Sequence, residues 1–257
     1  MASQVAEIVF LLGLLLMGSG RETELVSIPG GVTTPFYSVG VQQVEVSPFY
    51  LEEYPVTNAQ FLKFVSNHPQ WRRSQIKQVF AEEKYLSHWD GDLSFSPELA
   101  DRPVVNVSWF AARAYAQSHG RRLPTGDEWE LVARASEDSL DGSSEPAFRQ
   151  RILSWYGRPS TARPAPVGSV FRNAYGVHDM HGLVWEWVED YNTVLVTGDS
   201  RSDGELNRDL YCAAGVSGTA DPGDYAAYMR YGFRSSLKPS YTVANLGFRC
   251  AADLPRR

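Results

Sequence analysis

The stretch from Asn173 to Trp187 reads NAYGVHDMHGLVWEW, and the fold can be inferred outward from it. From Val184 to Glu189 apolar and polar residues alternate, which predicts a strand. The same alternation recurs from Leu246 to Ala251, near the end of the sequence. We therefore expect strands at these two positions, and the histidines and the glutamate of the first stretch are candidate metal ligands.

Three helices are predicted on the N-terminal side of this stretch. The first starts near Thr57 and carries apolar residues at helical spacing. The second starts at Ser108, a residue type suited to an N-cap, and runs to Gly120. The third follows Thr125, which has capping-box spacing to Glu128. Further strands are expected at 25–31 and 41–51, and long loops at 70–102, 137–146 and 158–166.

Composition places the chain among ordinary soluble globular proteins. It has 257 residues, of which 43% are hydrophobic and 21% charged, and its formal net charge is −6. No long basic run is present, so nucleic acid is not an expected partner. Because no repeat and no shift in composition divides the sequence, we expect a single domain over residues 25–253, with few regular elements and long loops.

The N-terminus carries a predicted export signal. Residues 8–17 form an apolar run, which the small residues Gly18, Ser19 and Gly20 follow. Such a run is too short to span a bilayer and suits a signal peptide over residues 1–20. No cysteine follows it, so we expect no stable membrane anchor and a mature protein that is periplasmic or secreted. The alternative is a mis-assigned start or a buried segment, since no Lys or Arg precedes the run.

Four segments, in order along the chain, resemble the formylglycine-generating enzyme family, also called the sulfatase-modifying factor family. They are Tyr54–Phe61 (YPVTNAQF), Pro103–Trp109 (PVVNVSW) continuing at Arg121–Glu130 (RRLPTGDEWE), Asn173–Trp187 and Asn245–Ala251 (NLGFRCA). Together they cover nearly the whole mature chain. The resemblance implies an α+β fold of the C-type-lectin-like kind, rich in loops and low in regular secondary structure.

The resemblance also shows which part of the family's chemistry is missing. Enzymes of this family oxidise a cysteine of a client sulfatase to formylglycine, using O₂ and a copper ion held by two cysteines, because soft thiolates hold Cu(I). The matching positions here are Asp221 and Ala226, and no cysteine lies between Cys212 and Cys250. Formylglycine synthesis by the family mechanism is therefore not expected, while another oxidoreductase reaction stays open.

Tyr225, Arg230 and Arg234 match family residues near the missing cysteines, and with Asp221 they are the cleft candidates. The two arginines either line a cleft for a peptide or an acidic ligand, or form ion pairs in the core. Tyr225 either serves the cleft or packs on one face of a helix. Asp221 is either a general base or metal ligand, or part of an Asp-Pro-Gly turn.

Two groups of candidate metal ligands lie in and near the first stretch. His178, Met180 and His181 offer imidazole and thioether groups that suit copper. Cys212 would add a thiolate, and the alternative is a loop held by packing. Glu186 is either a calcium ligand or a buried carboxylate satisfied by backbone donors. The family's calcium motif has lost one side-chain oxygen here, so the resemblance implies a weakened calcium site.

Cys212 and Cys250 are the only two cysteines. In an oxidising compartment a disulfide between them would close a loop of about 38 residues and stabilise the fold by ~3–4 kcal/mol. A buried free thiol at Cys250 and a separate reactive thiol at Cys212 are the equal alternative, because the sequence gives no distance between their Cα atoms.

A subset of exported bacterial homologues without the cysteine pair is more similar still. It includes a pyoverdine-maturation protein (PvdO) and accessory proteins (NirV) encoded beside copper nitrite reductases, and residues Asp224–Leu237 resemble the second group. The resemblance implies an accessory or maturation factor for a periplasmic client of the copper nitrite reductase type. The alternatives are an oxidoreductase with cysteine-independent chemistry and a non-catalytic module that binds a ligand or peptide.

Overall fold

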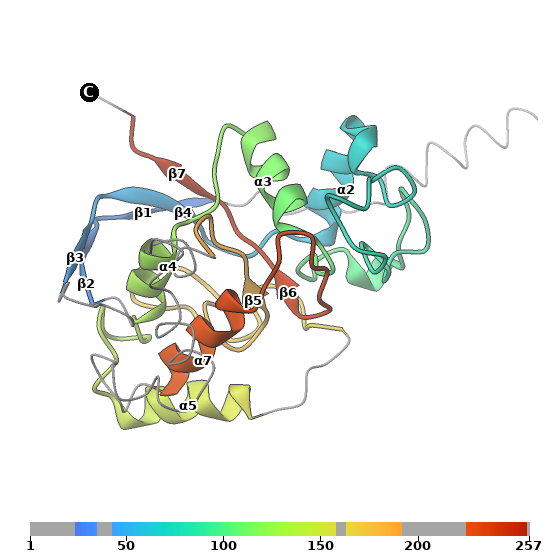
Figure 1. Ribbon diagram of the computed structural model, residues 1–257. Helices are drawn as coiled ribbons and strands as arrows, with labels where there is room; N and C mark the ends of the chain where they lie inside the picture. Colours follow the sequence, from blue (N-terminus) through green and yellow to red (C-terminus); the bar gives the residue numbers. More distant parts are fainter. Residues whose placement is uncertain (1–23, 35–42, 158–162, 192–224, 256–257) are drawn as a thin grey trace, which may run out of the picture.

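The structure is a computed structural model that describes residues 24–34, 43–157, 163–191 and 225–255 (Figure 1). The predicted signal peptide at 1–20 lies outside these ranges, as do Asp221 and Cys212. Within the described ranges, no helix has the length and apolar character needed to cross a membrane. The predicted class, a loop-rich α+β fold with little regular secondary structure, is confirmed.

A three-stranded antiparallel sheet joins the two ends of the described chain. Strand β4 (Phe49–Glu52) is central and pairs with β1 (Leu25–Ile28) on one side. On its other side it pairs with β7 (Ala251–Asp253). The last strand thus places the segment before it, which includes residues 247–250 of the NLGFRCA motif, against the N-terminal half of the fold.

A tight turn leads from β1 into a second, two-stranded sheet of β2 (Gly31–Thr33) and β3 (Val44–Val46). Gly30 in this turn has a φ of +77°, and a Cβ built there would lie 2.3 Å from the carbonyl oxygen of Val46. Glycine adopts that conformation without strain, and a larger residue would not fit that space. The strand predicted at 25–31 ends in its Pro-Gly-Gly turn as expected, whereas the strand predicted at 41–51 is divided into β3 and β4.

The strands predicted at 184–189 and 246–251 are shorter than expected. β5 (Trp185–Glu186) and β6 (Leu246–Gly247) pair in parallel over two residues each. Residues 186–188 are all buried, so both sides of this segment are covered by protein. The predicted lengths were wrong because the alternation arises in an enclosed loop and not in a strand with one solvent face.

The three predicted helices are confirmed, and each begins after a residue whose side-chain oxygen caps its first turn. They are α2 (Asn58–Asn67, capped by Thr57), α3 (Trp109–Ser118, capped by Ser108) and α4 (Gly126–Ala133, capped by Thr125). At α4 the Glu128 carboxylate accepts a hydrogen bond from the Thr125 backbone N–H at 2.8 Å, which completes the predicted capping box.

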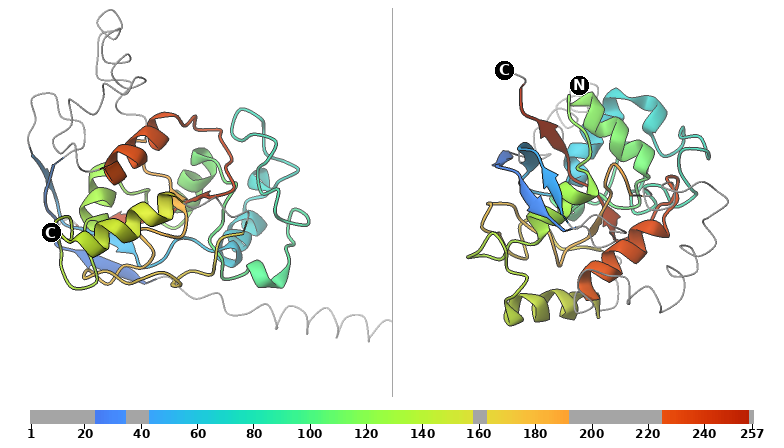
Figure 2. Two further views of the ribbon diagram at one scale, coloured as in Figure 1. Left: turned by 90° about the horizontal axis from the view of Figure 1, so that it is seen from below. Right: turned by 60° about the vertical axis from the view of Figure 1, so that its left-hand side comes forward.

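Two further helices, α5 (Pro146–Tyr156) and α7 (Tyr225–Ser235), lie side by side in all views (Figure 2). The sequence pattern did not predict α5, which starts with a proline in its first turn after the loop at 137–146. The long loop at 70–102 holds two 3₁₀ turns, Pro69–Trp71 and Pro97–Leu99.

The core is divided into packed clusters that correspond to these elements. The largest contains the ring contacts of Phe61 with Tyr115 and Phe248, which join α2, α3 and the C-terminal segment. A second cluster lies between the sheet and α4. A third, small cluster joins α5 to α7, and its members are Phe148, Ile152, Phe171 and Ala226. The candidate site lies at this third cluster.

Candidate functional site

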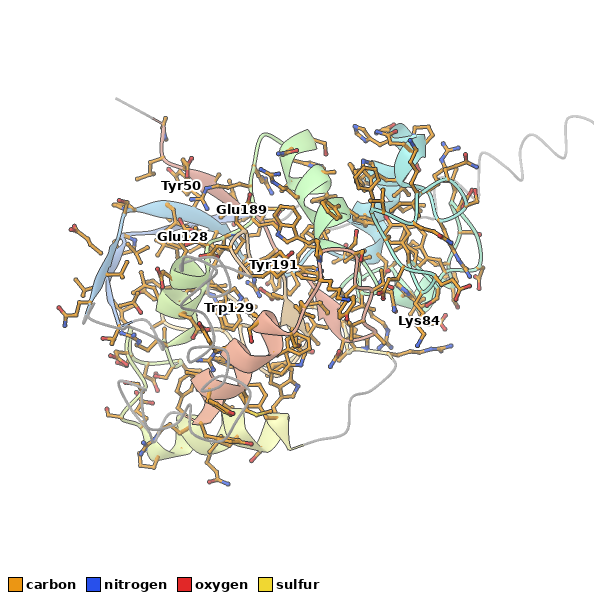
Figure 3. All side chains as sticks on the ribbon, viewed as in Figure 1. Tyr50, Lys84, Glu128, Trp129, Glu189 and Tyr191 are labelled. Carbon is orange, nitrogen blue, oxygen red and sulfur yellow. The ribbon has the colours of Figure 1, made fainter. Side chains whose placement is uncertain are left out.

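An ion-pair network joins α4 to α7. The carboxylate of Glu130 accepts hydrogen bonds from Arg230 (Nη2 to Oε2, 2.7 Å) and from Arg234 (Nη1 to Oε1, 2.8 Å). The two guanidinium carbons lie 5.8 and 4.5 Å from the ring centroid of Trp129, which Figure 3 shows between α4 and α7. Of the two roles predicted for these arginines, the structure shows the ion pairing.

This network contains two guanidinium groups and one carboxylate, so positive charge is in excess. Burial alone would raise the pKa of Glu130, but the charges of Arg230 and Arg234 outweigh it and lower that pKa to about 2. Two guanidinium groups therefore share one carboxylate. Arg230 also donates to the hydroxyl of Tyr156 at 3.2 Å, which extends the network to the end of α5.

A pocket of ≈ 570 Å³ adjoins the network at Tyr156. It lies between α5, residues 164–171 and the turn at 181–185, with Asn245 also contributing to its wall. Trp155, Tyr156 and Trp185 supply an aromatic wall, in which ring centroids of Tyr156 and Trp185 are 5.1 Å apart. Among the described residues that line the pocket there is no carboxylate.

α7 supports this wall from behind. The ring of Phe233 stacks on that of Trp185 with a centroid separation of 4.4 Å. Trp155 contacts the same indole at 5.3 Å. Because α4, α5, α7 and the 181–185 turn all meet here, the wall depends on the ion pairs as well as on apolar packing.

His181 lines the pocket and is buried. Its Nε2 lies 2.8 Å from the carbonyl oxygen of Ala133, and because a carbonyl only accepts, Nε2 carries the hydrogen. Burial and the charge of Arg230 lower the pKa of His181 to about 3, so the ring is neutral. Nδ1 is then an acceptor, and it is buried without a donor among the described residues.

The other members of the predicted copper group point into different surroundings. His178 stacks on Tyr54 at 4.7 Å, and its Nε2 lies 3.6 Å from the carboxylate of Glu53. Met180 is buried in the cluster between the sheet and α4. Within the described ranges, no group of three His, Cys, Asp or Glu side chains is arranged to hold a metal. In the described part of the chain these three side chains pack in different surroundings, and a copper site that also uses Cys212, which lies outside the described residues, stays a prediction.

Glu186 forms a buried ion pair with Arg249, and both side chains are 0% exposed. Arg249 donates from Nε to Oε2 and from Nη2 to Oε1, each at 2.8 Å. The indole of Trp129 donates to Oε2 at 2.8 Å. Glu186 thus takes the predicted role of a buried carboxylate, but its donors are side chains and not backbone groups. Calcium binding there stays a prediction.

Cys250 is buried, and burial raises the pKa of its thiol well above the ordinary value, with the Glu52 carboxylate adding to the shift. Its pairing with Cys212 stays a prediction, because Cys212 lies outside the described residues.

Tyr225 is 54% exposed at the start of α7 and stacks on Tyr228. Asp221 also lies outside the described ranges, so the cleft with Tyr225 stays a prediction.

The sequence profile of the "Sulfatase-modifying factor enzyme 1-like domain" matches residues 6–254. This chain belongs to the sulfatase-modifying factor family. The formylglycine-generating enzyme of Bos taurus is 28% identical and aligns with 90% of this chain and 75% of its own length. The "Inactive C-alpha-formylglycine-generating enzyme 2" of Bos taurus is also 28% identical, over 94% of this chain and 92% of its own.

A solved structure supports the fold of this family member. The structure of PvdO from Pseudomonas aeruginosa superposes with a TM-score of 0.51 and 22% identity, covering 90% of this chain and 95% of that one. The likeness concerns the fold alone.

The residues that the resemblance matches to the family's two cysteines do not fit a copper ion held by two thiolates. One of them, Ala226, offers no side-chain ligand atom. Its methyl group is buried among Phe148, Ile152 and Phe171. The other position, Asp221, supplies a carboxylate, which is a hard ligand and poorly suited to Cu(I).

Sequence reasoning missed the aromatic wall of the pocket. Trp155 and Tyr156 stand at the end of α5, a helix that the pattern did not predict. The adjacent Trp-Tyr pair in an otherwise polar segment was the only signal in the sequence. Glu130 was also missed, because its partners are 100 and 104 residues away.

Proposed function

We propose that this member of the sulfatase-modifying factor family is a non-catalytic accessory or maturation factor that binds a polypeptide segment of an exported client. The observation that carries the proposal is the burial of Ala226 in an apolar cluster, at a position where the family's copper chemistry needs a thiolate. The fold around that position is that of the family, but an apolar side chain that packs in the cluster stands where a thiolate ligand would be needed. A family relative whose name describes it as inactive is 28% identical over 94% of this chain and 92% of its own length.

The pocket beside α5 and α7 supports binding as the remaining activity. Its volume of ≈ 570 Å³ falls within the usual range for ligand pockets. Large aromatic side chains provide contact area at low entropic cost, so the wall of Trp155, Tyr156 and Trp185 suits a segment that inserts a side chain. We propose this pocket as the client-binding site.

The location and the client are parts of the same proposal. The predicted signal peptide supports action in the periplasm or outside the cell. The resemblance of Asp224–Leu237 makes a copper nitrite reductase the first client to test, and it rests on sequence alone.

The test combines a binding assay with a reaction assay on the full chain. Purified copper nitrite reductase, and overlapping peptides from it, are titrated into the protein by isothermal calorimetry. We expect saturable binding that Trp155→Ala weakens and that Phe80→Ala, an exposed aromatic outside the pocket, leaves unchanged. Absence of binding to the reductase and all its peptides would contradict the proposed client.

The reaction assay separates this proposal from the oxidoreductase alternative. A peptide that carries a client cysteine is incubated with the protein, Cu(I) and O₂, and its mass is followed. We expect no aldehyde product. Conversion of the peptide cysteine would overturn the non-catalytic assignment.

A further inference from the structure

We propose that the pocket between α5 and the 181–185 turn recognises an aromatic ring that carries an N–H or O–H donor, as in a tryptophan or tyrosine side chain. This inference rests on the proposed function and names the chemical group that the site accepts. It follows from three properties of the described walls: their aromatic character, their lack of carboxylates and one buried acceptor.

The aromatic wall selects a flat group. The rings of Tyr156 and Trp185 are nearly parallel, with an interplanar angle of 18°, and Trp155 packs against the same indole. Phe233 holds Trp185 from the side of α7, so this ring is fixed before any ligand arrives. A rigid aromatic surface binds another ring by offset stacking and gains ~0.5–1.5 kcal/mol beyond the area buried.

The charge of the pocket disfavours a cationic group. Among the described lining residues Arg151 is the one charged side chain, and no carboxylate is present to pair with an ammonium or guanidinium. The nearby network of Glu130 with Arg230 and Arg234 adds positive charge behind Tyr156. A neutral ring is therefore preferred over the side chains of lysine and arginine.

His181 favours ligands that carry a hydrogen-bond donor. Its Nε2–H is used by the Ala133 carbonyl, which leaves Nδ1 as an acceptor. Nδ1 has no donor among the described residues, and it is the unpaired buried acceptor on a residue that lines this pocket. Nδ1 is itself covered in the structure, so the proposal requires that a neighbouring side chain moves aside when the ligand binds. An indole N–H or a phenol O–H satisfies it, and a bare phenyl ring leaves it unpaired.

The decisive experiment compares ligands that differ by the donor alone. N-acetyltryptophanamide and its 1-methylindole analogue are titrated by calorimetry into the full chain, and N-acetyltyrosinamide is compared with N-acetylphenylalaninamide. We expect the analogue without a donor to bind about tenfold more weakly in each pair. Equal affinities within both pairs would overturn the role of His181.

Variants locate the binding in this pocket. Trp155→Ala is expected to weaken the binding of N-acetyltryptophanamide about five- to tenfold. The matched control Phe80→Ala is expected to leave this affinity unchanged. In His181→Gln the preference for the donor-bearing ligand should shrink, and the ligand pairs test the same point if this variant does not fold. No saturable binding of any of the four amides, or an unchanged affinity in Trp155→Ala, would overturn the inference.

Free indole and phenol distinguish the source of the ring. Tighter binding of the amides than of the free rings indicates a side chain on a client segment, whereas equal binding indicates a free aromatic compound; both outcomes support the pocket chemistry. Failure of the client assay with success of the amide titrations would remove the accessory function and keep this inference. If the client binds and Trp155→Ala does not change this binding, the accessory function is supported and the inference about the pocket is overturned.

Discussion

Replacement of Glu186 by glutamine is expected to destabilise the protein by about 3–5 kcal/mol, although the two side chains have nearly the same shape. Arg249 is 0% exposed and donates hydrogen bonds to both carboxylate oxygens of Glu186. Without the negative charge, the buried guanidinium loses the counter-ion to which it is directly hydrogen-bonded. Its remaining partners are neutral carbonyls of Glu52, Glu53 and His178. For a domain stable by about 5–15 kcal/mol, this loss takes a large part of the total.

The assay is urea unfolding at pH 7, followed by tryptophan fluorescence. Glu137→Gln is the matched control, because its carboxylate pairs with Arg151 on the surface, where both side chains are 45% exposed. Such a pair contributes less than about 1 kcal/mol. A double variant, Glu186→Gln with Arg249→Met, should lose less free energy than the sum of the two single variants, because the groups interact directly.

The same experiment tests calcium at this carboxylate. If Glu186 were a calcium ligand, calcium at a hundredfold excess over its Kd would add about 2.7 kcal/mol to the wild type, and Glu186→Gln would lose this gain. The ion pair with Arg249 predicts no such gain, whereas the calcium site that the resemblance implies predicts the full gain. A calcium-dependent rise that disappears in Glu186→Gln, or a cost below about 1 kcal/mol for that variant in the absence of calcium, would refute the ion-pair account.

Three further predictions concern local groups. Glu130→Gln should cost about 1.5–3 kcal/mol in urea unfolding at pH 7, because Arg230 and Arg234 lose their shared carboxylate. Because the pKa of Glu130 falls from 4.5 to about 2 on folding, its contribution is complete above pH 4.5 and is lost as the pH falls toward 2; equal acid losses in the variant and wild type would contradict this. The pKa of His181 falls from 6.5 to about 3 on folding, so the unfolded ring takes up a proton first and stability drops as the pH falls through this window. His181→Gln should flatten that part of the profile of unfolding free energy against pH, and an unchanged slope would argue against a buried neutral ring. Thr125→Ala should lower the free energy of unfolding by about 1 kcal/mol through loss of the α4 cap, with Ser154→Ala on the exposed face of α5 as a control; matching thermal midpoints for the two variants would count against the capping box.

Local chemistry explains which elements could be predicted. The starts of α2, α3 and α4 were found because a cap at Thr57, Ser108 or Thr125 bonds a backbone N–H three residues away. α5 was missed because only Phe148 and Ile152 of its 11 residues are buried, so its apolar stripe is short. The strands at 184–189 and 246–251 were overestimated because the apolar–polar alternation there lies in segments that are covered by protein on both sides.

By itself the sequence determined membership of the family, which depends on residue identity at fixed spacing, and the same spacing predicts the loss of its copper ligands. It also determined the caps, because their partners lie within one turn of helix. Only the tertiary structure decided what the candidate residues do. Glu130 meets Arg230 across 100 residues, and Glu186 meets Arg249 across 63. Whether an arginine lines a cleft or neutralises a carboxylate depends on which distant chain segment packs against it, and no local spacing carries that information.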